Sequence, residues 1–347
     1  MTGENGESQT LKKLAVITGA TGLLGSNLAI ELLSQGFNVR ATKRPSSKIQ
    51  HLSEYAIEWV NGDVGNKDSL VAAFKDADVV FHCAAAVDLI LQTTENMILT
   101  NVEGTRNVIE AVVQQRSSGK SPRLVYCSSV VTVGVADSPD EPADETHRWN
   151  FDEWKLNDGY TVTKTDAENL VKKALQDDAE FDAVIVNPTY IIGENDIGPS
   201  SGLMITTMKE MPVIPPGRSN FVDVKDVARG FVSAYSKGRR GERYILSGHN
   251  MKYEEFIITT CKLLNISPPK MKLPYSLSFT FALFGEAKQY FSGKEQSVNI
   301  TKARWGYCEN WVFKCDKAKQ ELQYEVSPIE PAIQRAIDWF RKHDMLK

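Results

Sequence analysis

The stretch Val16-Ile17-Thr18-Gly19-Ala20-Thr21-Gly22-Leu23-Leu24-Gly25 joins an apolar run to a helical pattern through three glycines spaced three residues apart. A tight turn needs a residue at positive φ, and a pyrophosphate needs backbone without a Cβ in its way. The glycines therefore mark either a phosphate cradle at a helix N-terminus or a plain tight turn. In the first case, the residues expected at the cofactor are Gly19, Thr21, Gly22, Leu23, Leu24 and Gly25.

The same order of strand and helix repeats through the first half of the chain. Apolar runs typical of buried strands occupy residues 13–18, 38–42, 58–61, 78–83, 123–127 and 183–187. Helical patterns occupy residues 23–35, 69–74, 105–115 and 161–175. This alternation predicts an α/β fold with a parallel, doubly wound sheet, helices on both of its faces, and ligands at the carboxyl edge.

The second half is more irregular, because prolines interrupt shorter elements. We expect residues 11–190 to form the dinucleotide-binding domain, with a return to its sheet around residues 219–248 that includes a strand at 244–246. Residues 191–347 are expected to form mainly a smaller, mixed lobe that binds the substrate. Its aromatic residues are interpreted mostly as core, with a minority lining an apolar pocket: Tyr253, Phe256, Tyr275, Phe279, Phe281 and Phe284.

Composition limits the class of protein. Hydrophobic residues make up 42% of the 347 residues and charged residues 24%, which is ordinary for a soluble protein. The net charge is −4, so the chain lacks the excess of lysine and arginine that is typical of nucleic-acid-binding proteins. The longest apolar stretch, residues 277–284, is too short to span a membrane and predicts a buried helix.

The N-terminus and the cysteines indicate a compartment. Residues 1–10 are polar, so we expect a disordered tail and no secretory signal. The five cysteines form an odd set without the spacing of a metal site, which suits reduced thiols. The sequence therefore predicts a cytoplasmic protein with no metal, and we assign the cysteines no chemistry.

Two cations follow the second predicted strand. In dinucleotide sites an acidic residue at this place holds a ribose diol, whereas this chain has Lys43 and Arg44. Guanidinium and ammonium groups suit a 2′-phosphate, so the pattern favours NADP(H), with NAD(H) possible. The alternative interpretation is a solvated basic turn.

The ends of the third and fourth strands offer further cofactor contacts. Asp63, next to Val64, either reaches the adenine amino group or caps a helix. Ala84 and Ala85 are small enough for a flat cofactor to lie close to them. His82 lies within an apolar run and is interpreted as a packed side chain rather than a catalytic one.

A tyrosine and a lysine lie four residues apart in the helical pattern that continues through Glu168. Tyr160 and Lys164 thus share one helix face, a spacing that is also common on helix surfaces. An ordinary tyrosine has a pKa of about 10, and a neighbouring ammonium together with a nicotinium charge is expected to lower it. The pair therefore suggests a proton donor and acceptor beside a nicotinamide.

Hydroxyl groups close the fifth strand at the same edge of the sheet. We expect Ser129 to hold a reacting oxygen and Ser128 to support it, although the two roles could be exchanged. Asn101 opens the helical pattern that precedes this strand, and it is either a cap residue or part of a water relay to Lys164.

Together these motifs resemble the extended short-chain dehydrogenase/reductase family, also called the epimerase/dehydratase family. The resemblance runs from about residue 14 to about residue 248 and includes Asn187-Pro188-Thr189 and Phe221-Val222-Asp223-Val224. It implies a seven-stranded Rossmann sheet, catalysis by Ser129, Tyr160 and Lys164, and frequently a homodimer through residues 105–115 and 161–175. It also implies that Tyr160, Lys164, Pro188, Thr189 and Ile191 lie at the cofactor.

Within the family, Arg44 and Asn187-Pro188-Thr189 are similar to the dihydroflavonol reductase and aldehyde/ketone reductase branch, which uses NADPH. The nucleotide-sugar branch has an arginine for a diphosphate where this chain has Ser219, with Arg218 one position away. We expect an NADPH-dependent carbonyl reductase or alcohol dehydrogenase that acts on a small molecule. The alternatives are an NAD-dependent nucleotide-sugar epimerase or dehydratase and an NADP-sensing binding protein.

Overall fold

The computed structural model describes residues 12–87, 92–197, 201–211, 213–292 and 299–346, so the predicted N-terminal tail lies outside it. A seven-stranded parallel sheet has the strand order β3-β2-β1-β4-β5-β6-β9. Its strands are β1 (Leu14–Thr18), β2 (Asn38–Lys43), β3 (Ile57–Asn61), β4 (Val79–His82), β5 (Arg123–Cys127), β6 (Ala183–Pro188) and β9 (Arg243–Leu246). The order reverses between β1 and β4, and ligands of such sheets bind at that point.

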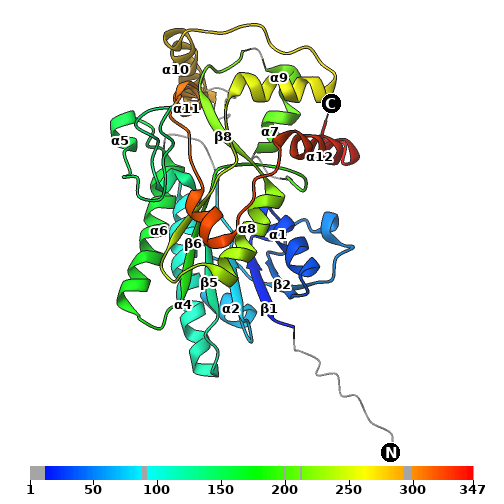
Figure 1. Cartoon of the computed structure of the whole chain (residues 1–347), viewed down its shortest axis with the longest axis vertical. Helices are drawn as coiled ribbons and strands as arrows, with labels where there is room; N and C mark the ends of the chain where they lie inside the picture. Colours follow the sequence, from blue (N-terminus) through cyan, green and yellow to red (C-terminus); the bar gives the residue numbers. More distant parts are fainter. Residues whose placement is uncertain (1–11, 88–91, 198–200, 212, 293–298, 347) are drawn as a thin grey trace, which may run out of the picture.

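Helices cover both faces of this sheet (Figure 1). On one face α1 (Leu23–Ser34) packs with α8 (Val224–Lys237), and their buried side chains include Leu28 and Phe231. On the other face lie α2 (Lys67–Ala73), α4 (Gly104–Gln114) and α6 (Gly159–Asp177). Successive strand residues alternate between the two apolar clusters, as the pleat requires. The predicted doubly wound α/β fold is confirmed.

A smaller mixed sheet has the order β10-β8-β7, with β7 (Tyr190–Ile192) parallel and β10 (His249–Lys252) antiparallel to β8 (Arg218–Asp223). It packs against α7 (Ser201–Thr206), α9 (Tyr253–Leu264) and α12 (Ile329–Lys342). Because β9 lies between β8 and β10 in sequence, the chain returns to the large sheet where a strand was predicted at 244–246.

The remaining helices are short or peripheral. They are α3 (Glu95–Met97), α5 (Phe151–Trp154), α10 (Tyr275–Ser292) and α11 (Ile300–Tyr307). Shorter helical turns occupy Gln50–Leu52, Ile98–Glu103, Gln115–Ser118, Val130–Thr132, Met208–Glu210 and Ala318–Leu322. Among the described helices, none is both long enough and apolar enough to cross a bilayer.

The prediction that residues 277–284 form a buried helix is wrong in one respect. The segment lies in α10, but Leu277, Phe281 and Phe284 are exposed. Only one side of α10 packs on α11, where Ala282 meets a small apolar cluster, and one neighbouring helix cannot cover an apolar run on every side. The interpretation of the aromatic residues as mostly core therefore holds for Phe256 and not for this helix.

Two of the three glycines in the first turn are required by packing. Gly19 has φ of 76°, and a Cβ there would lie 2.5 Å from the Ala84 nitrogen. A Cβ on Gly25 would lie 2.2 Å from the Gly19 oxygen. At Gly22 the nearest atom to a Cβ would be the same oxygen at 3.6 Å, an ordinary contact. The turn itself therefore does not explain the glycine at 22.

We predict that Gly25→Ala lowers the free energy of unfolding by about 3 kcal/mol, because its methyl group would overlap the backbone of Gly19. Gly22→Ala should cost about 1 kcal/mol or less, the difference between glycine and alanine at a helix start. Thermal or denaturant unfolding of both variants measures this contrast. Equal losses of stability in the two variants would show that the close packing of Gly25 on Gly19 does not restrict the residue at position 25.

Candidate active site

A capping box fixes the start of helix α6. The Asp158 carboxylate accepts a hydrogen bond from the Thr161 nitrogen at 2.8 Å, and Thr161 Oγ1 accepts one from the Asp158 nitrogen at 2.9 Å. Burial raises the pKa of Asp158 to about 6. The cap places Tyr160 in the first turn of α6 and Lys164 one turn later.

Lys164 joins α6 to the end of β5. Its ammonium is buried and donates to the Cys127 carbonyl at 2.7 Å and to the Tyr126 hydroxyl at 3.3 Å. It also lies 4.9 Å from the centre of the Tyr126 ring, within the range of a cation–π contact. The lysine is thereby held at the carboxyl edge of the large sheet.

Ser129, Tyr160 and Lys164 meet at this edge. Burial raises the pKa of Tyr160, while the Lys164 charge and a hydrogen bond with Ser129 act in the opposite direction. The net direction is upward, so the lowered pKa that we expected does not result from these protein groups. The phenol is therefore protonated at neutral pH.

The two serines face different partners. Ser129 Oγ accepts a hydrogen bond from the Val131 nitrogen at 3.3 Å and also reaches Tyr160. Ser128 Oγ instead donates to the Glu168 carboxylate at 2.5 Å. Of the two arrangements left open by the sequence, the geometry favours Ser129 beside the phenol and Ser128 as its support.

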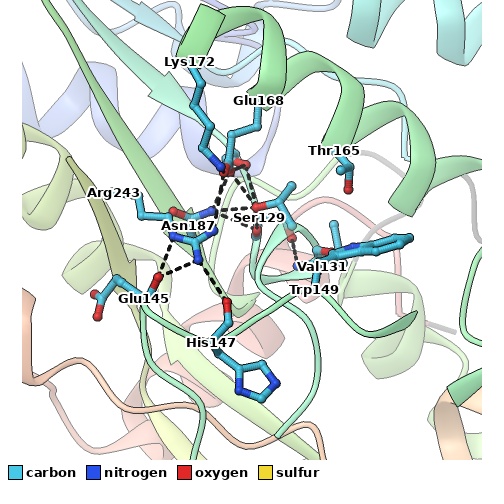
Figure 2. Close-up of polar contacts among 12 residues, drawn as sticks. Ser129, Val131, Glu145, His147, Trp149, Thr165, Glu168, Lys172, Asn187 and Arg243 are labelled. Atoms are coloured by element: carbon cyan, nitrogen blue, oxygen red, sulfur yellow. Dashed lines mark hydrogen bonds and ion pairs between the residues drawn. The ribbon is translucent and has the colours of Figure 1, made fainter. Parts of the chain in front are cut away.

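Sequence reasoning gave no role to Glu168, which is 1% exposed. Its Oε2 atom accepts from Ser128, from Thr132 Oγ1 at 2.6 Å and from Asn187 Nδ2 at 2.9 Å (Figure 2). Asn187 also donates to the Ser129 carbonyl at 3.0 Å. The carboxylate therefore holds the turn that carries Ser129 against helix α6.

The other oxygen of Glu168 faces two cations. Lys172 Nζ lies 2.6 Å and Arg243 Nη1 3.6 Å from Oε1. Burial raises the pKa of Glu168, but Lys172 and the hydroxyl donors outweigh it, so the pKa lies below its ordinary value. A cavity of about 310 Å³ adjoins this cluster and is lined in part by His147, Trp149, Thr165, Glu168, Lys172 and Arg243.

The first turn fits a dinucleotide phosphate. Helix α1 begins after Gly22 with no side-chain cap, which leaves the positive end of the helix open to an anion. The nearest protein atom to a Cβ at Gly22 would be the Gly19 oxygen at 3.6 Å, so packing within the protein does not require the glycine there. Thr21 and Leu23 are half-buried beside it, whereas Leu24 packs into the core.

The other expected cofactor residues lie along the same edge. Arg44 is exposed after β2, and among the described residues neither it nor Lys43 forms an ion pair. Ala84 touches Gly19, and Ala85 is exposed. Pro188 ends β6 and Ile191 lies in β7.

The side chains of Thr189 and Val64 contact other residues of the protein. The Thr189 hydroxyl donates to Asn220 Oδ1 at 2.7 Å. Val64 packs against Gly104, where a Cβ would lie 2.9 Å from its side chain.

Two cap interpretations are wrong. The cap of α2 is Asn66, while the Asp63 carboxylate accepts from the Gly65 nitrogen at 2.9 Å. Asn101 lies inside the turn Ile98–Glu103 and hydrogen-bonds the backbone of Ala86 and the Thr163 hydroxyl. Asp63 therefore holds the turn before α2, and Asn101 joins the segment after β4 to helix α6.

His82 is confirmed as a packed side chain. Its ring nitrogens lie 2.7 Å from Thr18 Oγ1 and 3.2 Å from Thr105 Oγ1. Burial, followed by the Lys164 charge, lowers its pKa to about 3, so the ring is neutral. Among the described residues, no group of three or more acidic, histidine or cysteine side chains could hold a metal.

An aromatic cluster adjoins Tyr160. The Trp311 ring lies 5.3 Å from Phe151 and 4.7 Å from Trp305, and Tyr160 packs against the same cluster. Tyr160 thus has polar neighbours in Ser129 and Lys164 and an apolar contact with this cluster.

The chain has relatives over nearly its whole length. A protein from Synechocystis sp. that is provisionally named dihydroflavonol 4-reductase is 34% identical, covering 95% of each chain. The sterol demethylase protein B of Methylococcus capsulatus is 28% identical, covering 95% of this chain and 99% of its own. The crystal structure of gox2253 is 33% identical with a TM-score of 0.82, covering 97% of this chain and 100% of its own.

Residues 15–247 match the model of the NAD dependent epimerase/dehydratase family. This range contains the glycine turn, Ser129, Tyr160 and Lys164. The chain therefore belongs to the NAD dependent epimerase/dehydratase family, the extended short-chain dehydrogenases/reductases, and is an NAD(P)-dependent enzyme of the oxidoreductase type.

Proposed function

We propose that this protein is an NADPH-dependent reductase of ketones or aldehydes, because Ser129 and Lys164 converge on the phenol of Tyr160. The glycine turn would hold the phosphates of a nicotinamide nucleotide, which when bound would supply the hydride for the carbonyl carbon. Tyr160 donates its proton to the carbonyl oxygen, and Ser129 orients that oxygen. The charge of Lys164 then stabilises the phenolate that remains.

The protonated phenol of Tyr160 can act as the acid of a reduction. Burial raises its pKa, so the side chain enters the reaction carrying its proton. A protonated phenol is the acid that a carbonyl oxygen needs, whereas oxidation of an alcohol needs a base.

The choice of NADPH rests on the end of β2. Lys43 and Arg44 offer two cations without an acidic neighbour in the turn that follows the strand. A 2′-phosphate would pair with them, and the diol of NADH would not.

The aromatic cluster supports a substrate with an apolar skeleton. Tyr160 packs against the cluster that contains Phe151, Trp305 and Trp311, and Trp305 is the half-buried member of these three. Relatives named as a dihydroflavonol 4-reductase and a sterol demethylase protein point to polycyclic compounds of this kind. Such skeletons bury apolar area against aromatic side chains.

One observation favours a nucleotide-sugar enzyme as the second candidate. Arg218 begins β8, and its Nε atom is buried without a hydrogen-bond partner among the described residues. A diphosphate could use this guanidinium. The adjacent Ser219, where that branch carries its arginine, instead hydrogen-bonds Tyr253. Purified protein that retains NAD and melts at a higher temperature with a UDP- or dTDP-sugar would favour this candidate.

We predict that the wild-type protein oxidises NADPH with aromatic or alicyclic ketones or aldehydes, and that Tyr160→Phe lowers kcat by at least about 100-fold. NADPH affinity should change little, because the phenol acts on the substrate oxygen. Tyr235→Phe is the control, since Tyr235 lies on α8 and contacts Phe37 and Phe81 instead. An unchanged rate in Tyr160→Phe with NADPH still bound would favour the NADP-sensing alternative.

We predict that Lys43→Ala/Arg44→Ala raises the Kd of NADPH by about tenfold to a hundredfold, the loss of charged hydrogen bonds to a phosphate. The Kd of NADH should change by less than about twofold. Lys48→Ala removes an exposed cation beyond the same turn and serves as the control. Equal changes for both nucleotides would contradict recognition of a 2′-phosphate.

We predict that Glu168→Ala lowers the unfolding free energy by about 1–3 kcal/mol and kcat by about tenfold, because Ser128, Thr132 and Asn187 lose their common acceptor. Glu168→Gln should retain more activity, since an amide oxygen still accepts from these donors. Asp177→Asn removes the carboxylate of an exposed ion pair on the same helix and should change neither quantity.

The KM of NADPH distinguishes a positioning role for Glu168 from general damage. It should stay within about twofold in Glu168→Ala, because the polar partners of Glu168 among the described residues do not include a residue of the glycine turn. A fall in stability with an unaltered kcat would show that the Ser129 turn keeps its place without Glu168.

A further inference from the structure

Helix α10 presents an exposed apolar stripe. Leu277, Phe281 and Phe284 follow one another at spacings of four and three residues, which places them on one face of the helix. Phe281 is 54% exposed and Phe284 is 69% exposed. These are large side chains with about half or more of their surface in solvent, and the stripe extends over two turns.

The opposite face of α10 is already packed. Ala282 contacts the buried Ile300 and Ala303 of α11, and the Tyr275 ring lies 5.3 Å from that of Tyr307. The Arg304 guanidinium lies 6.0 Å from the Phe279 ring. These contacts hold the helix at the outer end of the smaller lobe, where Figure 1 shows it beside α11, and leave the stripe facing outward.

Neighbouring side chains enlarge the stripe into a patch. Met271 and Leu283 are 54% and 47% exposed. Patches of this kind on soluble proteins usually mark a contact with a partner or a membrane. We call these residues, with Leu277, Phe281 and Phe284, the α10 patch.

The surrounding sequence is basic in an otherwise acidic protein. Residues 262–304 contain seven lysines and arginines and two glutamates, a net charge of +5, whereas the whole chain carries −4. Lys270 and Lys272 are exposed immediately before the helix, and Lys272 also pairs with Glu254 at 2.8 Å. An apolar face bordered by cations is characteristic of helices that lie in the interface of an anionic bilayer.

We propose that the α10 patch docks on the surface of an anionic lipid bilayer, with the helix in the plane of the interface. The apolar side chains enter the boundary between headgroups and acyl chains, and the lysines face the acidic headgroups. Charge decides against a second copy as the occupant. A two-fold contact would bring the same +5 segment of each copy together, whereas an anionic surface neutralises it.

Docking places the smaller lobe against the membrane. Helix α11 carries Ala303 toward α10 and Trp305 toward the aromatic cluster beside Tyr160. The patch is therefore one helix away from the cluster that Tyr160 packs against. Docking through the α10 patch does not depend on which reaction the enzyme catalyses.

Co-sedimentation of the full chain with lipid vesicles tests the proposal without any substrate. The wild-type protein should pellet with vesicles that contain phosphatidylglycerol and much less with vesicles of phosphatidylcholine alone, and high salt should weaken the binding. Leu277→Ser/Phe281→Ser/Phe284→Ser should lower the bound fraction by at least about tenfold. Because all three side chains are exposed, its melting temperature should match that of the wild type.

Leu99→Ser is the matched control, since Leu99 is 51% exposed on the larger domain, outside the α10 patch. It should bind vesicles as the wild type does. Wild-type protein that stays in the supernatant with both lipid compositions overturns the proposal, and so does equal binding by the triple variant. A triple variant that changes a dimer to a monomer in light scattering, with no vesicle binding by either protein, assigns the patch to a second copy instead.

Discussion

The buried carboxylate of Glu168 is the constraint on which the catalytic geometry depends. Helix α6 and the turn after β5 belong to different parts of the chain, and Lys164 already joins α6 to the Cys127 carbonyl at the end of β5. Ser128, Thr132 and Asn187 all donate to one oxygen of this carboxylate, and Lys172 neutralises the other. A buried charge is tolerable only with such complete pairing, so the pairing fixes the distance between the two elements.

Much of the fold could be predicted because local patterns determine it. The strands β1, β4, β5 and β6 are buried on both faces, which only a sheet covered by helices on both sides explains. The strand β10 could not be found in this way, because His249–Lys252 is polar and takes its register from β8. The exposure of residues 277–284 could not be predicted either, because an apolar run does not determine how many helices or strands pack against it.

The residues of the candidate site also differ in how far the sequence predicts them. The spacing of Tyr160 and Lys164 and the position of Ser129 at a strand end were visible in the sequence. Glu168 was not, although it continues the stripe of Tyr160 and Lys164 by one further turn and is a carboxylate on a buried helix face. That position was the available signal. Its partners Ser128 and Arg243 lie 40 and 75 residues away, so only the fold brings them together.

The pKa of Tyr160 shows why the chemistry needs the structure as well as the motif. Lys164 and Ser129 act on the phenol as the motif implies, yet burial acts more strongly and in the opposite direction. Tyr160 packs against the buried aromatic cluster around Trp311, and packing of this kind removes water from the phenol. The contacts that seat this side chain in the fold thus also favour its neutral form, so that its position and its protonation state have one physical origin.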